Sequence, residues 1–179
     1  MYYIAFLRAI NVGGHTVTME TLRGLFSDLG FENVRSYIQT GNVFFESPEL
    51  DREKLSKKIQ DHLRNNLGYE VGTIISTLPE LEEILQADPF ASKTLQDDTR
   101  HCVICTSSEV TGLTLPYLTK KQDVEVICVF PGALCAVLHL KDGKPGNSNT
   151  VIEKEFGVTC TTRFYHTFIK IVEAARQIS

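Results

Sequence analysis

The stretch from Arg8 to Asn42 limits the possible folds more than any other part of the chain. A short apolar run that ends at Arg8 predicts a buried strand. Apolar residues at helical spacing between Met19 and Leu29, after the candidate N-cap Thr18, predict a helix. Two short strands are then predicted on either side of a tight turn at 39–42. This order indicates a mixed fold in which one strand-helix-strand unit separates two polar, glycine-bearing loops.

The first half of the chain completes a β-α-β-β-α-β order. A helix opened by Ser47-Pro48 and ended by Gly68 is followed by a strand from Glu70 to Ile75. This order is the ferredoxin-like, or split βαβ, pattern. A further helix, capped by Thr77, is expected to link it to the second half. We therefore place the first unit and its linker helix at residues 1–91.

The second half, residues 92–179, is predicted to repeat that order. A strand precedes an expected helix over 109–118, a hairpin folds around Pro131-Gly132, Thr150 opens a short helix, and Thr162 caps the last one. The predicted fold class is α+β, with two ferredoxin-like βαββαβ units packed together and antiparallel sheets covered by helices. The pattern leaves open whether the halves form one compact domain or two, and one sheet or two.

Composition indicates an ordinary globular protein. The chain has 179 residues, of which 42% are hydrophobic and 22% charged, with a formal net charge of −4. Such a balance argues against a general nucleic-acid binder, which normally carries a basic face. Its start does not resemble a secretory leader, and it contains no apolar run of the roughly 20 residues that span a bilayer. An odd number of cysteines, five, favours free thiols and a reducing compartment. We expect a cytoplasmic protein without a membrane partner.

The loop after the first strand is the first candidate site. Adjacent glycines allow backbone N–H groups to converge on an anion, and the following helix brings its positive end. The guanidinium of Arg8 matches carboxylate or phosphate. This loop predicts an anion-binding role for Arg8, Asn11, Gly13 and Gly14. The plain alternative is that the glycines serve turn geometry and that Arg8 pairs with a local carboxylate.

Two other polar segments are candidates for the same role. The turn Gln39-Thr40-Gly41-Asn42 supplies amide and hydroxyl groups, although turn geometry alone also explains these residues. Thr162-Arg163 lies where the last helix is expected to begin, and a helix N-terminus favours anions. Its plain alternative is a capping Thr beside a surface Arg.

The cysteines do not predict a metal or redox site. Val103 and Ile104 favour a strand, which would place Cys102 and Cys105 on opposite faces. Cys128 and Cys135 would face each other only if their hairpin has a two-residue loop, and they are then expected to stay reduced.

Histidines and strand aromatics offer weaker signals. His15 and His166 are the two histidines near proposed sites, and either is a candidate acid-base group. Tyr3, Tyr37 and Phe45 lie on predicted strands, where a stacking surface for RNA is one interpretation and core packing the commoner one.

Several motifs together resemble a known family. The segments RAINVGG at 8–14, LGF at 29–31, YIQTGNV at 37–43, Pro89-Phe90 and Thr162-Arg163 are similar to those of the bacterial "domain of unknown function sixteen-ninety-seven" family. The resemblance covers nearly the whole chain and implies two ferredoxin-like halves, but no established activity. The family usually continues its Thr-Arg with Asn-Trp-Asn-Thr, whereas Phe164, Tyr165, His166 and Thr167 stand here.

These observations predict that the chain binds a small anionic or phosphorylated ligand. The site would combine the 8–14 loop, the 39–42 turn and the start of the last helix, without a metal or a cofactor. An enzyme at the same site, an RNA or single-strand nucleic-acid binder, and a protein-interaction module are the alternatives. Neither a catalytic residue nor an oligomeric state is predicted.

Overall fold

The computed structural model describes residues 1–11 and 13–177, and the chain divides into two compact units. The first unit comprises Met1–Leu78 together with the chain from Ile171 onward, and the second comprises Pro79–Lys170. This division differs from the predicted boundary near residue 91. The linker helix falls in the second unit, and the end of the chain returns to the first.

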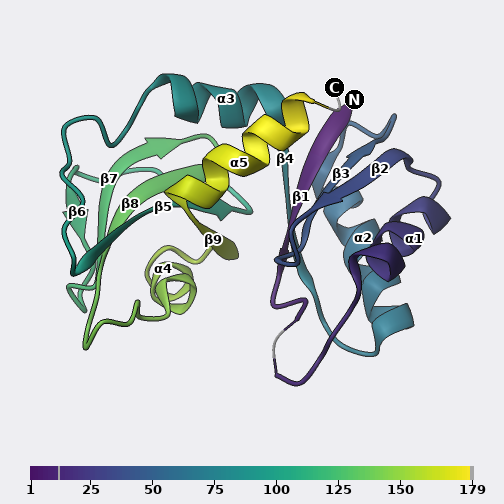
Figure 1. Ribbon diagram of the computed structural model, residues 1–179, viewed down its shortest axis with the longest axis horizontal. Coiled ribbons are helices and arrows are strands. Elements are labelled where there is room, and N and C mark those ends of the chain that lie inside the picture. The colour runs from purple at the N-terminus through teal and green to yellow at the C-terminus, as the bar shows by residue number, and fades with distance from the viewer. Residues whose placement is uncertain (12, 178–179) are drawn as a thin grey trace. The chain divides into compact units, whose positions relative to one another are not determined.

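The first unit has the element order that its sequence predicts. Its elements are β1 (Tyr2–Arg8), α1 (Met19–Asp28), β2 (Glu32–Tyr37), β3 (Asn42–Glu46), α2 (Arg52–Leu67) and β4 (Gly72–Thr77). The strands form a four-stranded antiparallel sheet in the order β2-β3-β1-β4. Helices α1 and α2 lie on one face of this sheet (Figure 1).

Both faces of the central strand β1 are buried. Tyr3, Ala5 and Leu7 point to the helices and join a core that includes Leu22 of α1 and Ile59 of α2. The alternate residues of this strand and its neighbour, Ile4, Phe6 and Phe44, are also 0% exposed. A strand buried on both faces reads as a continuous apolar run, which explains the sequence YIAFL. Tyr3 and Phe45 are therefore core residues, and the interpretation of these two as an RNA-stacking surface is wrong.

Helix ends in the first unit follow local rules. Thr18 caps α1 as predicted, and Gly68 ends α2 in a left-handed conformation with φ of 82°. The predicted start of α2 at Ser47-Pro48 is wrong, because Asp51 is the N-cap: its carboxylate accepts from the backbone N–H groups of Glu53 and Lys54, each at 3.1 Å. A carboxylate that satisfies two helical N–H groups is a stronger start signal than a proline.

The second unit contains a separate sheet. Its elements are α3 (Leu78–Gln86, from the boundary residue), β5 (Thr99–Thr106), β6 (Tyr117–Leu118), β7 (Val124–Phe130), β8 (Ala133–His139), α4 (Ser148–Phe156), β9 (Cys160–Phe164) and α5 (Tyr165–Arg176, shared with the first unit from Ile171). Five antiparallel strands are ordered β6-β7-β8-β5-β9. Its core packs Ile152 of α4 against residues such as Cys102, Ile104 and Leu134.

The helix predicted over 109–118 is wrong. This segment is a loop that ends in the short strand β6. Gly112 has a φ of 76°, outside the helical region, and Pro116 has no N–H to donate to a helical carbonyl. The second unit therefore does not show the full β-α-β-β-α-β order. The described residues form an α+β fold with two antiparallel sheets and five helices.

Two helix starts in the second unit also differ from prediction. Asn147, not Thr150, caps α4, and its side-chain oxygen accepts from the backbone N–H of Thr150 at 3.2 Å. The last helix begins at Tyr165, three residues after the predicted cap Thr162. Strand β9 extends to Phe164 because it pairs with β5 as far as the contact of Cys102 with Phe164.

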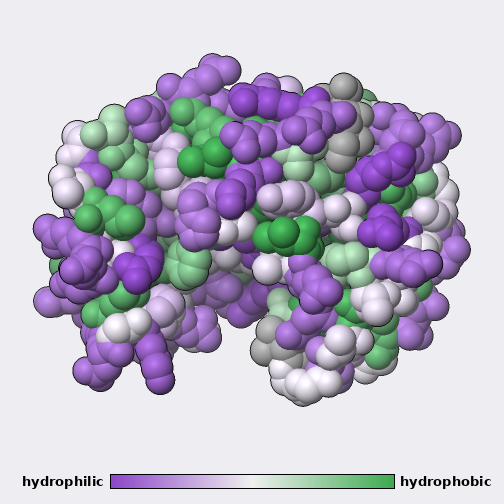
Figure 2. Space-filling model, in the orientation of Figure 1, coloured by the Kyte–Doolittle hydropathy of each residue, from purple (hydrophilic) through white to green (hydrophobic). Residues whose placement is uncertain are grey.

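One face of the molecule is mainly polar. On the face shown in Figure 2, hydrophilic side chains predominate and apolar residues form small, separate groups. Within residues 1–11 and 13–177, no helix combines the length and the apolar character needed to cross a bilayer.

Candidate functional site

The structure joins two of the three predicted site segments. Asn11, in the loop after β1, donates from Nδ2 to the backbone carbonyl of Gln39 at 3.1 Å. Its Oδ1 accepts from the backbone N–H of Val17 at 2.7 Å. One side chain thus ties the loop both to the β2–β3 turn and to the approach to α1, so loop and turn form one surface at one end of the first unit's sheet.

Only glycine fits at position 41 without strain. Its φ is 74°, and a Cβ added there would lie 2.8 Å from Cγ2 of Ile10 and 3.0 Å from Cβ of Leu7. Its carbonyl accepts from the backbone N–H of Leu7 at 2.8 Å. Gly41 therefore serves the close approach of the turn to β1, which is the plain interpretation of this residue.

Asn42 also holds the turn. It is 0% exposed, and its Nδ2 donates to the carbonyl of Tyr37 at 3.2 Å and to Oγ1 of Thr40 at 2.8 Å. A buried amide donor needs such partners. Asn42 thus fixes the shape of the turn, while Gln39 and Thr40 are exposed at its tip.

Left-handed backbone conformations are concentrated on this surface. Ala9 has a φ of 59° and Ile38 a φ of 49°. A β-branched residue with positive φ is an outlier, which costs about 1–3 kcal/mol and persists only where surrounding contacts enforce it. Ile38 is nevertheless 43% exposed, so burial of its side chain does not explain the strain.

The glycine pair and Arg8 complete the loop. Gly13 and Gly14 have φ of 69° and 87° and are exposed, with open space where a Cβ would stand. Arg8 is the last residue of β1, opposite Gly72 of β4, and is partly buried. Successive left-handed glycines can direct their backbone N–H groups toward the oxygens of an anion, and Arg8 brings a positive charge to the start of the same loop.

Tyr69 is a contributor that the sequence reasoning missed. Its hydroxyl donates to the carbonyl of Ile10 at 2.8 Å, and its ring stacks on His15 with centroids 3.8 Å apart. Burial raises the pKa of the Tyr69 hydroxyl above its ordinary value. Only its position directly after the helix-ending Gly68 hinted at a role, since that turn returns the chain toward the loop.

Thr162 and Arg163 are placed in the second unit, within β9. The hydroxyl of Thr162 donates to Oδ1 of Asn149 at 2.7 Å and lies 3.0 Å from the hydroxyl of Ser148. Arg163 is 9% exposed and donates to Oγ1 of Thr161 at 2.9 Å. Burial lowers the pKa of the Arg163 guanidinium from its ordinary value. The interpretation of Thr162 as the cap of the last helix is wrong, because this residue pairs with Ile104 of β5.

The residues that depart from the family pattern, 164–167, come directly after Arg163 in the chain. Tyr165 contacts the ring of Phe90 edge-on, with centroids 4.6 Å apart, and Phe90 stacks on His101 at 4.3 Å. His166 is exposed in the first turn of α5. Burial, with a smaller effect of Lys93, lowers the pKa of the His101 imidazole.

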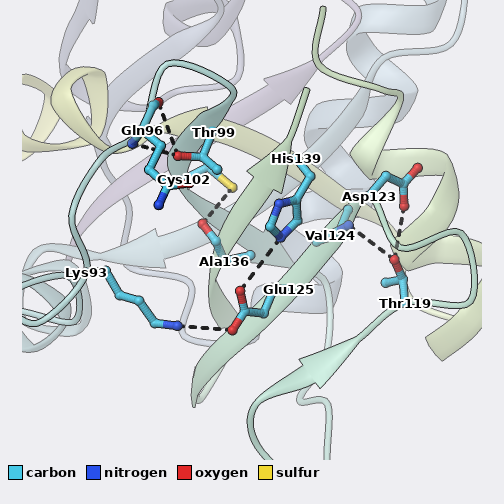
Figure 3. A network of polar contacts seen from close by, with 10 residues as sticks. All are labelled: Lys93, Gln96, Thr99, Cys102, Thr119, Asp123, Val124, Glu125, Ala136 and His139. Atoms are coloured by element: carbon cyan, nitrogen blue, oxygen red, sulfur yellow. Dashed lines mark hydrogen bonds and ion pairs between the residues drawn. The ribbon is translucent and has the colours of Figure 1, made fainter. Parts of the chain in front are cut away.

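A polar network in the second unit was not predicted (Figure 3). Glu125 of β7 contacts Nζ of Lys93 at 3.0 Å and Nε2 of His139, on β8, at 3.7 Å. Nearby, the hydroxyl of Thr119 donates to Asp123 at 3.0 Å and accepts from the backbone N–H of Val124 at 3.2 Å. The contact of Lys93 with Glu125 ties a loop to strand β7 and joins positions 32 apart, so no local pattern indicates it.

Metal ligands do not gather in the described part of the chain. No group of three or more His, Cys, Asp or Glu side chains there has a geometry that would hold a metal ion. Cys102 and Cys105 lie on opposite faces of β5, as predicted, because only Cys102 joins the core beneath α4.

Comparison with known proteins shows the family but not an activity. No curated protein matches the chain. The conserved bacterial protein SP0830 from Streptococcus pneumoniae has a similar structure, with a TM-score of 0.66 and 23% sequence identity over 97% of this chain and 98% of that one. At this identity the likeness shows a shared fold. A family model described as "Protein of unknown function (DUF1697)" matches residues 1–130, which confirms the resemblance seen in the sequence motifs. The chain therefore belongs to this family of proteins of unknown function.

Proposed function

We propose that the loop after β1 and the β2–β3 turn bind a small anionic or phosphorylated ligand. The observation that carries this proposal is the side chain of Asn11, which joins the loop to the turn through bonds to Gln39 and Val17. A loop that served only to connect two elements would not need a second loop held against it. Loops fixed on a rigid sheet are the common location of binding residues.

The strained backbone supports a binding role. Ala9 and Ile38 flank the joined surface, and both adopt conformations that non-glycine residues rarely take. Strain of this kind concentrates at functional sites, where it holds groups in the geometry that a ligand requires.

The residues divide into two roles. Asn11, Gly41 and Asn42 hold the shape, because their polar atoms or their space are committed to neighbouring groups. The ligand contacts are assigned to exposed groups, namely the backbone of Gly13 and Gly14 and the side chains of Gln39 and Thr40. Arg8, which is partly buried, supplies the positive charge. An anion is the favoured ligand class, since glycine N–H groups, a helix N-terminus and a guanidinium all favour negative charge.

Two broader proposals accompany this one. The first unit is a ferredoxin-like unit, supported by its β-α-β-β-α-β order and its β2-β3-β1-β4 sheet. The protein acts in the cytoplasm, supported by five free cysteines.

Thermal unfolding of the full chain with inorganic phosphate, nucleotides, sugar phosphates and short RNA tests the function. A bound compound at 100 times its dissociation constant adds about 2.7 kcal/mol of stability. Arg8→Gln removes the charge while retaining a polar side chain. We expect it to weaken binding about tenfold or more, because hydrogen bonds to charged groups contribute about 1.5–3 kcal/mol.

Arg64→Gln is the matched control. Arg64 lies on α2 of the same unit, its side chain is 51% exposed, and it pairs with Asp61 and Glu70. The same loss of one positive charge there should leave binding unchanged. Equal weakening by both variants would indicate a general charge effect, and no stabilisation by any phosphorylated compound would refute the proposal.

Arg163→Lys in the same assay tests the remaining sequence-based proposal, that Thr162 and Arg163 of the second unit have an anion-binding role. Lys keeps the charge but not the fork of donors that serves Thr161. A lower affinity in a folded variant supports such a role for Arg163. An unchanged affinity assigns it to the structure of the second unit.

A further inference from the structure

Two cysteines of the second unit face each other across a hairpin. Cys128 of β7 and Cys135 of β8 are direct partners in the antiparallel register, followed by the pairs Val129 with Leu134 and Phe130 with Ala133. The loop between the strands is therefore the two residues Pro131-Gly132, the condition under which the sequence predicts that the thiols meet. Directly opposed residues have Cβ atoms about 4.5–5.5 Å apart, on the same face.

Disulfide formation at this position needs only a small adjustment. Disulfides span Cα distances of about 4.4–6.8 Å and Cβ distances of about 3.5–4.5 Å. The strand register of β7 shifts between Val126 and Cys128, so the ladder is irregular next to the cysteine. An irregularity of this kind bends the strand and increases its twist locally, next to the position where the two sulfurs would join.

The two thiols are chemically unequal. Cys135 is buried, whereas Cys128 is partly exposed. Hydrogen bonding to Cys135 holds the pKa of the Cys128 thiol below its ordinary value, despite an opposing effect of burial. The same contact and burial raise the pKa of the Cys135 thiol. The thiolate is the nucleophile, so Cys128 is the thiol that reacts first.

The other three cysteines provide an internal contrast. Cys102, Cys105 and Cys160 are all buried. Burial raises the pKa of the Cys105 thiol to about 12 and that of Cys102 as well. Their partners in the strand registers include Ala136, Ala133 and Thr106 rather than a second thiol. They are buried, and the residues directly opposite them in these registers are not cysteines.

We propose that Cys128 and Cys135 are a redox modification site that forms a reversible intramolecular disulfide on reaction with a hydroperoxide. The Cys128 thiolate attacks a peroxide oxygen, the O–O bond breaks, and an alcohol or water leaves after taking up a proton. Cys128 is then a sulfenic acid. Cys135 attacks its sulfur, the S–S bond forms, the S–O bond breaks, and the hydroxide leaves as water with the proton of Cys135. Two thiols are oxidised by two electrons, and the hydroperoxide is reduced by two.

A dithiol reductant reverses the modification. Its thiolate attacks one sulfur of the disulfide, its second thiol releases the mixed disulfide, and the two electrons return to Cys128 and Cys135. The inference concerns the second unit and does not depend on the proposed anion site.

Peptide mapping of the folded full-length chain tests the inference. After treatment with hydrogen peroxide, the chain is denatured and its thiols are alkylated. Trypsin then releases residues 122–141, which contain Cys128 and Cys135 and no other cysteine. We expect this peptide to be unalkylated and lighter by two hydrogen atoms, and the chain to lose two of its five alkylatable thiols. Dithiothreitol should restore both. A doubly alkylated peptide, or a covalent dimer, would overturn the proposal.

Single variants separate the two roles. Cys135→Ser should stop at the sulfenic acid of Cys128, which dimedone traps, and Cys128→Ser should leave Cys135 unmodified. The control Cys105→Ala should lose the same two thiols as the unsubstituted chain. Oxidation of Cys135 in Cys128→Ser would contradict the assigned order. The peptide map of the unsubstituted chain shows whether the disulfide forms, even if a variant fails to fold.

Discussion

At the scale of single residues, Gly41 allows the β2–β3 turn to pack closely against Leu7 and Ile10. We expect Gly41→Ala to lower the free energy of unfolding by about 2–5 kcal/mol. Its left-handed backbone disfavours a Cβ by about 1–2 kcal/mol, and the new atom would stand 2.8 Å from Ile10, where overpacking typically adds about 1–3 kcal/mol. Urea-induced unfolding measures this loss.

Gly68→Ala is the control for the backbone effect alone. Gly68 has a φ of 82° but no atom within 4 Å of the position of an added Cβ. Its substitution should lower stability by only about 1–2 kcal/mol. Equal losses in the two variants would show that the contact with Ile10 and Leu7 does not restrict the turn.

The candidate site illustrates which residue roles a sequence can predict. Glycine and asparagine in the 39–42 turn followed from turn chemistry, because that chemistry depends on neighbouring residues. The bond from Asn11 to Gln39 joins positions 28 residues apart, and the bond from Tyr69 to Ile10 joins positions 59 apart. No periodicity encodes such contacts. The sequence therefore identified Asn11 as a candidate but not its role, and missed Tyr69.

At the scale of elements, the N-cap of α2 links helix stability to pH. Hydrogen bonding from the Lys54 backbone N–H, then from its side chain, holds the pKa of the Asp51 carboxyl below its ordinary value. A lowered pKa stabilises the fold at pH values above the unfolded pKa, and the contribution disappears as pH falls through the folded one. We expect Asp51→Ala to lower the melting temperature by roughly 2–4 °C at pH 7 and by progressively less below about pH 4.

Asp51→Asn distinguishes the cap from the charge. Asn accepts the same backbone hydrogen bonds without titrating. Differential scanning calorimetry of the three proteins should show a difference between Asn and Ala that does not vary with pH. If Asp51→Ala melts like the unsubstituted chain at pH 7, the assignment of the cap is wrong.

The elements that were predicted correctly are those fixed by adjacent residues. Thr18, Gly68 and the Pro131-Gly132 hairpin follow local rules, and the structure confirms them. One wrongly predicted segment depends on a distant partner. Strand β9 reaches Phe164 because β5 supplies its hydrogen bonds, whereas the sequence predicted a helix cap at Thr162. In 109–118, a weak apolar pattern predicted a helix. Gly112 and Pro116, which both disfavour helix, prevent it from forming.

At the scale of the whole molecule, the chain is divided by packing rather than by sequence order. The first unit contains both Met1–Leu78 and the segment from Ile171 onward. A sequence read from one end to the other suggests two consecutive halves, because a boundary is inferred from composition along the chain. The return of the final segment to the first unit depends on long-range packing, which composition does not record.

The role of that final segment leads to a prediction. Ile171 is 0% exposed and belongs to the first unit, whereas Glu173, two residues later on α5, is exposed. Ile171→Ala should lower the free energy of unfolding by about 2–5 kcal/mol, since it removes buried methylene groups and leaves a cavity. Glu173→Ala should change it by less than about 0.5 kcal/mol.

Hydrogen exchange shows which unit the lost contacts stabilised. In Ile171→Ala, the amides of β1 and β3 should exchange faster than in the unsubstituted chain, because both strands belong to the unit that contains Ile171. The amides of β7 and β8 should be affected less, and Glu173→Ala should change neither set. Faster exchange confined to β7 and β8 would assign Ile171 to the second unit and contradict the division of the chain.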